Sequence, residues 1–172
     1  MVEIQPPMLG KTEKNPQLDL LKVPLIHFIN PNHDLSKRAS TISWESIEKD
    51  FSNYYSSKGA PSIPIRTMVG LTILKQVFRY SEKTTIQHWL ENPYWQYFCG
   101  EVYFQHKPPF HFHDFSAFRK RIGSEGYAKI MKLAAEIFGK EGEKAFRSRR
   151  ENYRRVIPAG ILRKMFGRIR IK

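Results

Sequence analysis

The chain has 172 residues, of which 41% are hydrophobic and 13% aromatic, so it can bury a core and is excluded from the wholly disordered class. A formal net charge of +13 favours polyanionic partners, nucleic acid first and anionic membrane surfaces second. The single cysteine, Cys99, excludes an intrachain disulfide, and no apolar run predicts a signal peptide or a membrane helix. The expectation is a soluble cytoplasmic protein with no membrane partner.

Charge and proline content divide the chain into three predicted parts. Residues 1–31 contain five prolines, which break helices, and are expected to form an extended arm. Residues 32–143 are expected to form a helical domain. Residues 144–172 hold 11 Lys or Arg and one Glu, so most of the excess charge belongs to a basic tail that is expected to be poorly ordered.

The first predicted helices follow the arm. Within the arm, Leu20, Leu21, Leu25 and Ile26 are expected to pack on the domain. A short helix is expected in Asn32–Ala39. Apolar residues at helical spacing then predict a helix over Ser43–Tyr55, with Ser43 as its N-cap.

The middle of the chain predicts three consecutive helices. Pro64–Tyr80 begins with a proline suited to a first helical turn and is apolar on most faces, which predicts the central, most buried helix. Ser81–Glu91 is expected to be capped by Ser81. Pro93–Cys99 is expected to be short and closed by Gly100.

A loop is expected over residues 101–113, which contain two consecutive prolines and no clear period. Asp114 is expected to cap a helix over Phe115–Ile122, Gly123 to interrupt it, and a last helix to cover Glu125–Phe138. No strand pattern is found. The predicted class is therefore all-α, a compact multi-helix domain with helix-turn-helix-like features.

The segment Asp114–Gly123 is the sharpest candidate for binding. Phe115, Phe118 and Ile122 recur at i, i+3 and i+7 and can anchor one side, which leaves basic side chains on the other. Such side chains contact DNA phosphates, and Arg reads guanine in the major groove. The alternative is a solvated basic helix end. The predicted DNA contacts are Arg119, Lys120, Arg121 and Ser116, with Arg66, Lys75 and Arg79 as a second set.

Other constellations point away from catalysis and metal binding. The aromatic cluster Trp89, Tyr94, Trp95, Tyr97, Phe98, Tyr103 and Phe104 can stack on bases, but core filling is the favoured interpretation. Cys99 with the three histidines of residues 106–113 matches no paired zinc signature, so exposed loop histidines are favoured. No catalytic residues are assigned, and no cofactor is expected.

Five blocks of the sequence resemble one family in order along roughly residues 25–143. They are Asn32–Leu35, Ile42–Glu45, Pro61–Leu71, Trp89–Glu101 and Phe118–Gly123. These blocks look like the N-terminal domain of bacterial insertion-sequence transposases of the type called "IS five". The string Asn-Pro-Tyr-Trp-Gln-Tyr-Phe-Cys-Gly in the fourth block is the most specific of these motifs.

The resemblance implies a helical domain that binds double-stranded DNA at the terminal inverted repeats of a mobile element, in a bacterial, nucleoid-associated setting. In full-length members it implies a following RNase H-like domain whose Asp-Asp-Glu set holds Mg²⁺, with the first Asp soon after the position of Glu143. Residues 144–150 contain no Asp, and no Asp follows Asp114, so none of those acids is carried over. A frameshift or deletion is one hypothesis for residues 144–172, and a natural basic DNA-binding tail is the other.

Four functional hypotheses follow. The leading one is a DNA-binding transposase fragment that is not itself an enzyme. The second is an enzyme whose partner chain supplies the acids. The third is an interaction fragment that pairs with itself or with full-length transposase and inhibits it. The fourth is a pseudogene product without a role.

Overall fold

The computed structural model describes residues 23–55 and 62–140, and this part of the chain is all-helical, as predicted. It contains no strand, and only an isolated antiparallel bridge joins Pro24 to Tyr103. Its elements are η1 (Leu25–His27), α1 (Asp34–Thr41), α2 (Trp44–Ser52), α3 (Ile65–Phe78), α4 (Glu82–Glu91), α5 (Pro93–Phe98) and α6 (Asp114–Phe138). Every predicted helix is present, most with ends shifted by one to three residues.

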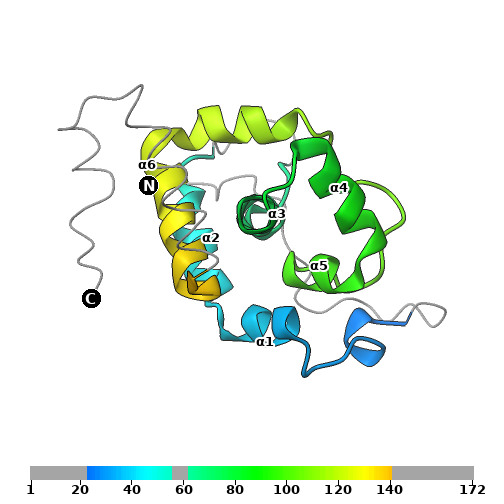
Figure 1. The fold of residues 1–172 in the computed structure, drawn as a ribbon. Helices are drawn as coiled ribbons and strands as arrows, with labels where there is room; N and C mark the ends of the chain where they lie inside the picture. The colour runs from blue at the N-terminus through cyan, green and yellow to red at the C-terminus, as the bar shows by residue number, and fades with distance from the viewer. Residues whose placement is uncertain (1–22, 56–61, 141–172) are drawn as a thin grey trace, which may run out of the picture.

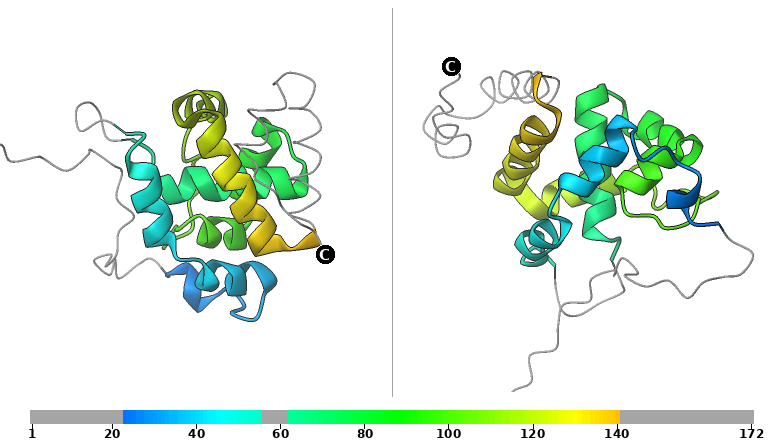
Figure 2. Two further views of the ribbon diagram at one scale, coloured as in Figure 1. Left: turned by 90° about the vertical axis from the view of Figure 1, so that its left-hand side faces the viewer. Right: turned by 90° about the horizontal axis from the view of Figure 1, so that it is seen from below.

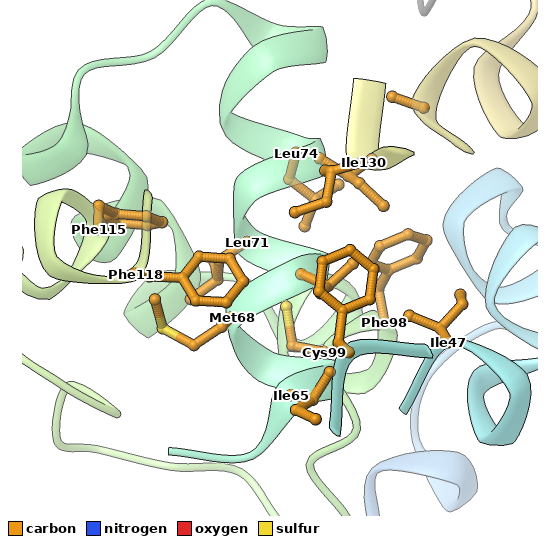
Figure 3. Close-up of a cluster of buried hydrophobic side chains, with 14 of the residues drawn as sticks. Ile47, Ile65, Met68, Leu71, Leu74, Phe98, Cys99, Phe115, Phe118 and Ile130 are labelled. Atoms are coloured by element: carbon orange, nitrogen blue, oxygen red, sulfur yellow. The ribbon is translucent and has the colours of Figure 1, made fainter. Parts of the chain in front are cut away.

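Helix α3 forms the centre of the domain, with the other helices arranged around it (Figures 1 and 2). It packs against α2, α4 and α6, and α1 closes the bottom of the domain against α5. Nine of its residues are buried, in agreement with an apolar pattern that covers most of its faces. Figure 3 shows Met68 and Leu71 beside Phe118 of α6, and Leu74 beside Ile130 farther along the same helix.

Side-chain caps explain where two of the helices begin. The Ser81 hydroxyl accepts a hydrogen bond from the Thr84 amide at the start of α4, as predicted. Asn92 caps α5 by accepting from the amides of Tyr94 and Trp95, and Pro93 occupies its first turn. After α5, Gly100 adopts φ +98°, a conformation that favours glycine.

Two predicted caps differ from the structure. Ser43 occupies the N-cap position of α2 but makes no side-chain cap hydrogen bond. Asp114 is the first residue of α6 and not its cap, because its carboxylate accepts instead from the backbone N–H of His111 in the preceding loop. The carboxylate therefore closes the loop onto the helix start, which the sequence pattern did not distinguish from capping.

The predicted interruption at Gly123 divides α6 into two straight halves. Gly123 has φ +64° and ψ −170°, and the two halves run in different directions in Figure 1. In Figure 1 the first half lies above the end-on α3 and beside the start of α4, and the second half runs downward at a steep angle to it. The glycine thus lets one continuous segment cover two faces of the central helix.

Replacing Gly123 with alanine is expected to lower the free energy of unfolding by about 2 kcal/mol, because that backbone region is almost closed to residues with a Cβ atom. An added Cβ would meet no atom within 4 Å, so conformational strain and not crowding is the cause. Chemical denaturation of Gly123→Ala and of Ser124→Ala, its exposed neighbour, would measure this difference. Equal stability of the two variants would contradict it.

The N-terminal part of the described chain packs only partly as predicted. Leu25 is fully buried, and its amide donates to the Val102 carbonyl at 2.7 Å. Ile26, which was expected to pack, is instead 60% exposed, because the 3-10 turn of η1 directs successive side chains to different sides. Leu20, Leu21 and the basic tail lie outside the described residues.

Candidate nucleic-acid interface

Arg119, the first of the predicted DNA contacts, is tied into the protein by an ion pair. Its guanidinium lies 3.3 Å from the Glu82 carboxylate of α4. The same carboxylate oxygen lies 2.8 Å from the ammonium of Lys75 on α3. One acid thus joins three helices, and both cations are partly neutralised. We name Lys75, Glu82 and Arg119 the charge hub.

The aromatic rings around the charge hub reinforce this internal role. The Lys75 ammonium lies 5.1 Å from the centre of the Phe115 ring, and the Arg119 guanidinium 5.4 Å from that of Tyr127. The side chain of Lys75 is only 11% exposed. These contacts fix the first half of α6 on α3 and α4, so the hub determines how the remaining basic side chains are presented.

The other predicted contacts on α6 point outward. Ser116 and Lys120 are exposed and lie four residues apart, hence on one face of the helix. Arg121 is exposed as well, with its guanidinium 4.8 Å from the Tyr55 ring centre. Burial raises the pKa of Tyr55, and Arg121 partly opposes that rise. Lys120 forms no ion pair with any described residue, whereas Arg119, Lys129 and Lys132 of this helix each lie beside a carboxylate.

Arg66 belongs to a different part of the structure. Its guanidinium donates to the carbonyls of Tyr97 and Phe98 at 3.1 and 3.4 Å, at the end of α5. It also lies over the Trp44 ring at 4.7 Å, and burial lowers its pKa. Carbonyls at a helix end lack intrahelical donors, so Arg66 serves as a C-terminal cap for α5. The structure does not bring it together with the charge hub.

Arg79 lies in the turn that joins α3 to α4. It is exposed and adopts φ 58° and ψ 35°, the left-handed conformation, while its amide donates to the Lys75 carbonyl. This ends α3 after Phe78, and Ser81 then caps α4. The exposed guanidinium therefore starts from a turn directly beside the charge hub.

Lys83 and Gln87 are exposed on α4 and were missed as candidates. Helical spacing could have found them. The buried residues Thr85, Ile86 and Trp89 share one side of α4, which leaves positions 83 and 87 on the other side. A lysine and a glutamine four residues apart do not form a run of basic residues, so charge clustering alone does not single them out. The exposed polar surface of this region thus includes α4 as well as α6.

The aromatic cluster mainly fills the core, which is the interpretation that the sequence pattern favours over base stacking. Trp89, Trp95 and Phe98 are buried, and Tyr94, Tyr97, Tyr103 and Phe104 are partly buried. Trp95 also lies beside Tyr80 and His88, whose rings stack at 4.4 Å. This stack braces the α3–α4 turn against α5.

Cys99 is buried, and no group of three or more potential metal ligands occurs within residues 23–55 and 62–140. An added Cβ at Gly70 would lie 3.2 Å from the Cys99 sulfur, so α3 and the end of α5 approach closely. Burial raises the pKa of the thiol, which favours its neutral form. Cys99 is therefore a packing residue in this fold.

Comparison with known proteins identifies the family of this domain. Residues 23–121 match a family model described as a transposase domain (DUF772). The chain belongs to this transposase domain family. The match covers every element from η1 through the first half of α6, including the charge hub. No catalytic domain was identified.

A curated relative of this transposase domain is the uncharacterized protein ORF8 of the nfe locus of Rhizobium meliloti. It is 38% identical over 118 residues, which is 69% of this chain and 57% of the relative. The chain thus spans little more than half the length of that relative. No solved structure matches the chain. Within the described residues, no helix combines the length and the apolar character needed to cross a bilayer.

Proposed function

We propose that this transposase domain is the DNA-binding part of an insertion-sequence transposase of the IS-five type, and that it holds duplex DNA at the ends of the element. The exposed basic side chains at the junction of α3, α4 and α6 form the contact surface. The proposal concerns binding, and it assigns no step of DNA cleavage or joining to this domain.

The observation that supports this proposal is a difference between two groups of cations. Some are neutralised by the Glu82 carboxylate, and others are exposed and form no ion pair with any described residue. Lys75 and Arg119 share the Glu82 carboxylate inside the junction. Around them, Arg79, Lys83 and Lys120 are exposed and form no ion pair with any residue in the described ranges. Free cations held on a rigid helical frame suit phosphate contacts, which release counterions and make binding depend on salt.

Replacing Lys120 with alanine is expected to weaken binding to duplex DNA several-fold and to lower the slope of log affinity against log salt by about one, as for the loss of one phosphate contact. Lys132→Ala is the matched control, because Lys132 is an exposed lysine on the second half of α6, 3.9 Å from Glu136. Fluorescence anisotropy with a labelled duplex over a salt series would measure both.

Two results would count against the proposed function. The first is a wild-type chain that ignores duplex DNA even at low salt. The second is an equal loss of affinity in Lys120→Ala and Lys132→Ala, since a general effect of net charge would then explain binding without a defined surface.

A further inference from the structure

We infer that α4, and not the first half of α6, is the helix that reads bases in the major groove, while α6 braces α4 and contacts the phosphate backbone. This inference rests on the proposed DNA-binding function and assigns its base-reading surface. It places Lys83 and Gln87 at the bases, and Lys120 and Arg79 at the phosphates.

The connection between α3 and α4 has the geometry of a helix-turn-helix. Only Arg79, Tyr80 and Ser81 separate the two helices. The left-handed conformation of Arg79 turns the chain sharply, and the Ser81 cap starts α4 at once. Figure 1 shows α3 end-on and α4 lying across the view, so the two helices are steeply crossed. In such a motif the second helix enters the major groove and uses its N-terminal residues on the bases.

The exposed side of α4 has side chains suited to base edges. Lys83 and Gln87 lie four residues apart on the face opposite Thr85, Ile86 and Trp89. Lysine pairs with the O6 and N7 acceptors of guanine, and glutamine makes a bidentate pair with adenine. Glu91 follows on the same face at the far end of the helix, away from the groove-entering end. The face is therefore polar and cationic where it would meet DNA.

The first half of α6 is less suited to that role. Phe115, Phe118 and Ile122 are buried, and Arg119, the side chain best able to read guanine, is held by Glu82. The loop before this helix is also much longer than a helix-turn-helix turn, since α5 ends at Phe98 and α6 begins at Asp114. Of the two exposed cations of this helix half, Arg121 lies over the Tyr55 ring, and Lys120 is a compact charge that favours a phosphate partner.

The test uses the full chain and a pool of duplexes with a randomised central segment, selected by binding and then sequenced. Wild type is expected to enrich a defined sequence. Gln87→Ala is expected to lose the preference for adenine at one position, by about tenfold or more for that base. Gln87→Lys is expected to move the preference at that position from adenine to guanine. Lys120→Ala is expected to lower affinity without changing the enriched sequence.

Each other outcome overturns a specific statement. An unchanged sequence preference in Gln87→Lys and Lys83→Ala, together with an altered one in Lys120→Ala, would assign reading to α6 and overturn this inference while the proposed function stands. Binding without any enriched sequence would also overturn it. No binding of the pool by wild type would overturn the proposed function itself. Circular dichroism of each variant checks that the exposed substitutions leave the fold intact.

Discussion

Replacing Gln96 with leucine is expected to lower the free energy of unfolding by about 3 kcal/mol, because it leaves several buried polar groups without partners. The Gln96 side chain is fully buried. Its amide nitrogen donates to the carbonyls of Trp89 and Gln105 at 3.1 and 2.9 Å, and its amide oxygen accepts from the Gln105 N–H at 2.7 Å. One side chain thereby attaches the loop before α6 to the ends of α4 and α5.

Leucine has nearly the volume of glutamine, so this substitution removes hydrogen bonds while creating little cavity. Urea denaturation followed by tryptophan fluorescence would measure the loss. Gln87→Leu is the matched control, since Gln87 is an exposed glutamine of α4 and its replacement should change stability by no more than about 0.5 kcal/mol. A loss no greater than that of the control would mean that the Gln105 backbone is satisfied in another way.

The helices could be predicted because their signals are local. An apolar stretch with no polar face identified α3 as the central helix, and single residues such as Ser81 and Gly123 marked where helices start or break. The specific string from Asn92 to Gly100 combines several such signals. Asn92 caps α5, Gln96 holds the following loop, and Gly100 supplies a positive φ. Each of these roles depends on one residue type at one position of the string.

Whether a basic side chain is paired inside the protein or exposed could not be predicted, because that depends on partners far away in the sequence. Glu82 lies 37 residues from Arg119, and Arg66 lies about 30 residues from the carbonyls that it caps. A run of three cations at 119–121 looks uniform in the sequence. In the fold, Arg119 is paired, Lys120 is free and Arg121 lies against Tyr55. Charge patterns therefore locate the basic segments, and only the tertiary structure separates the cations that are paired inside the protein from those that are exposed.

The second large effect is expected at the charge hub, where Glu82→Gln should lower the free energy of unfolding by about 2 kcal/mol. The variant removes the negative charge that lies 2.8 Å from the largely buried Lys75 ammonium. The ion pair between Glu82 and Arg119 contributes less to stability, because the Arg119 side chain is 36% exposed and water screens the pair. Double-mutant cycles with Lys75→Met and Arg119→Met should therefore give a clearly larger coupling for Lys75, and equal couplings would contradict this ranking.

The same substitution distinguishes the structural from the electrostatic role of Glu82. It removes a negative charge beside Arg79, Lys83 and Lys120, so nonspecific affinity for DNA at low salt should rise while stability falls. A fall in both quantities would indicate that the hub is needed to hold the interface together. A rise in affinity that disappears at high salt would indicate that the frame survives and that the carboxylate limits the positive field at this junction.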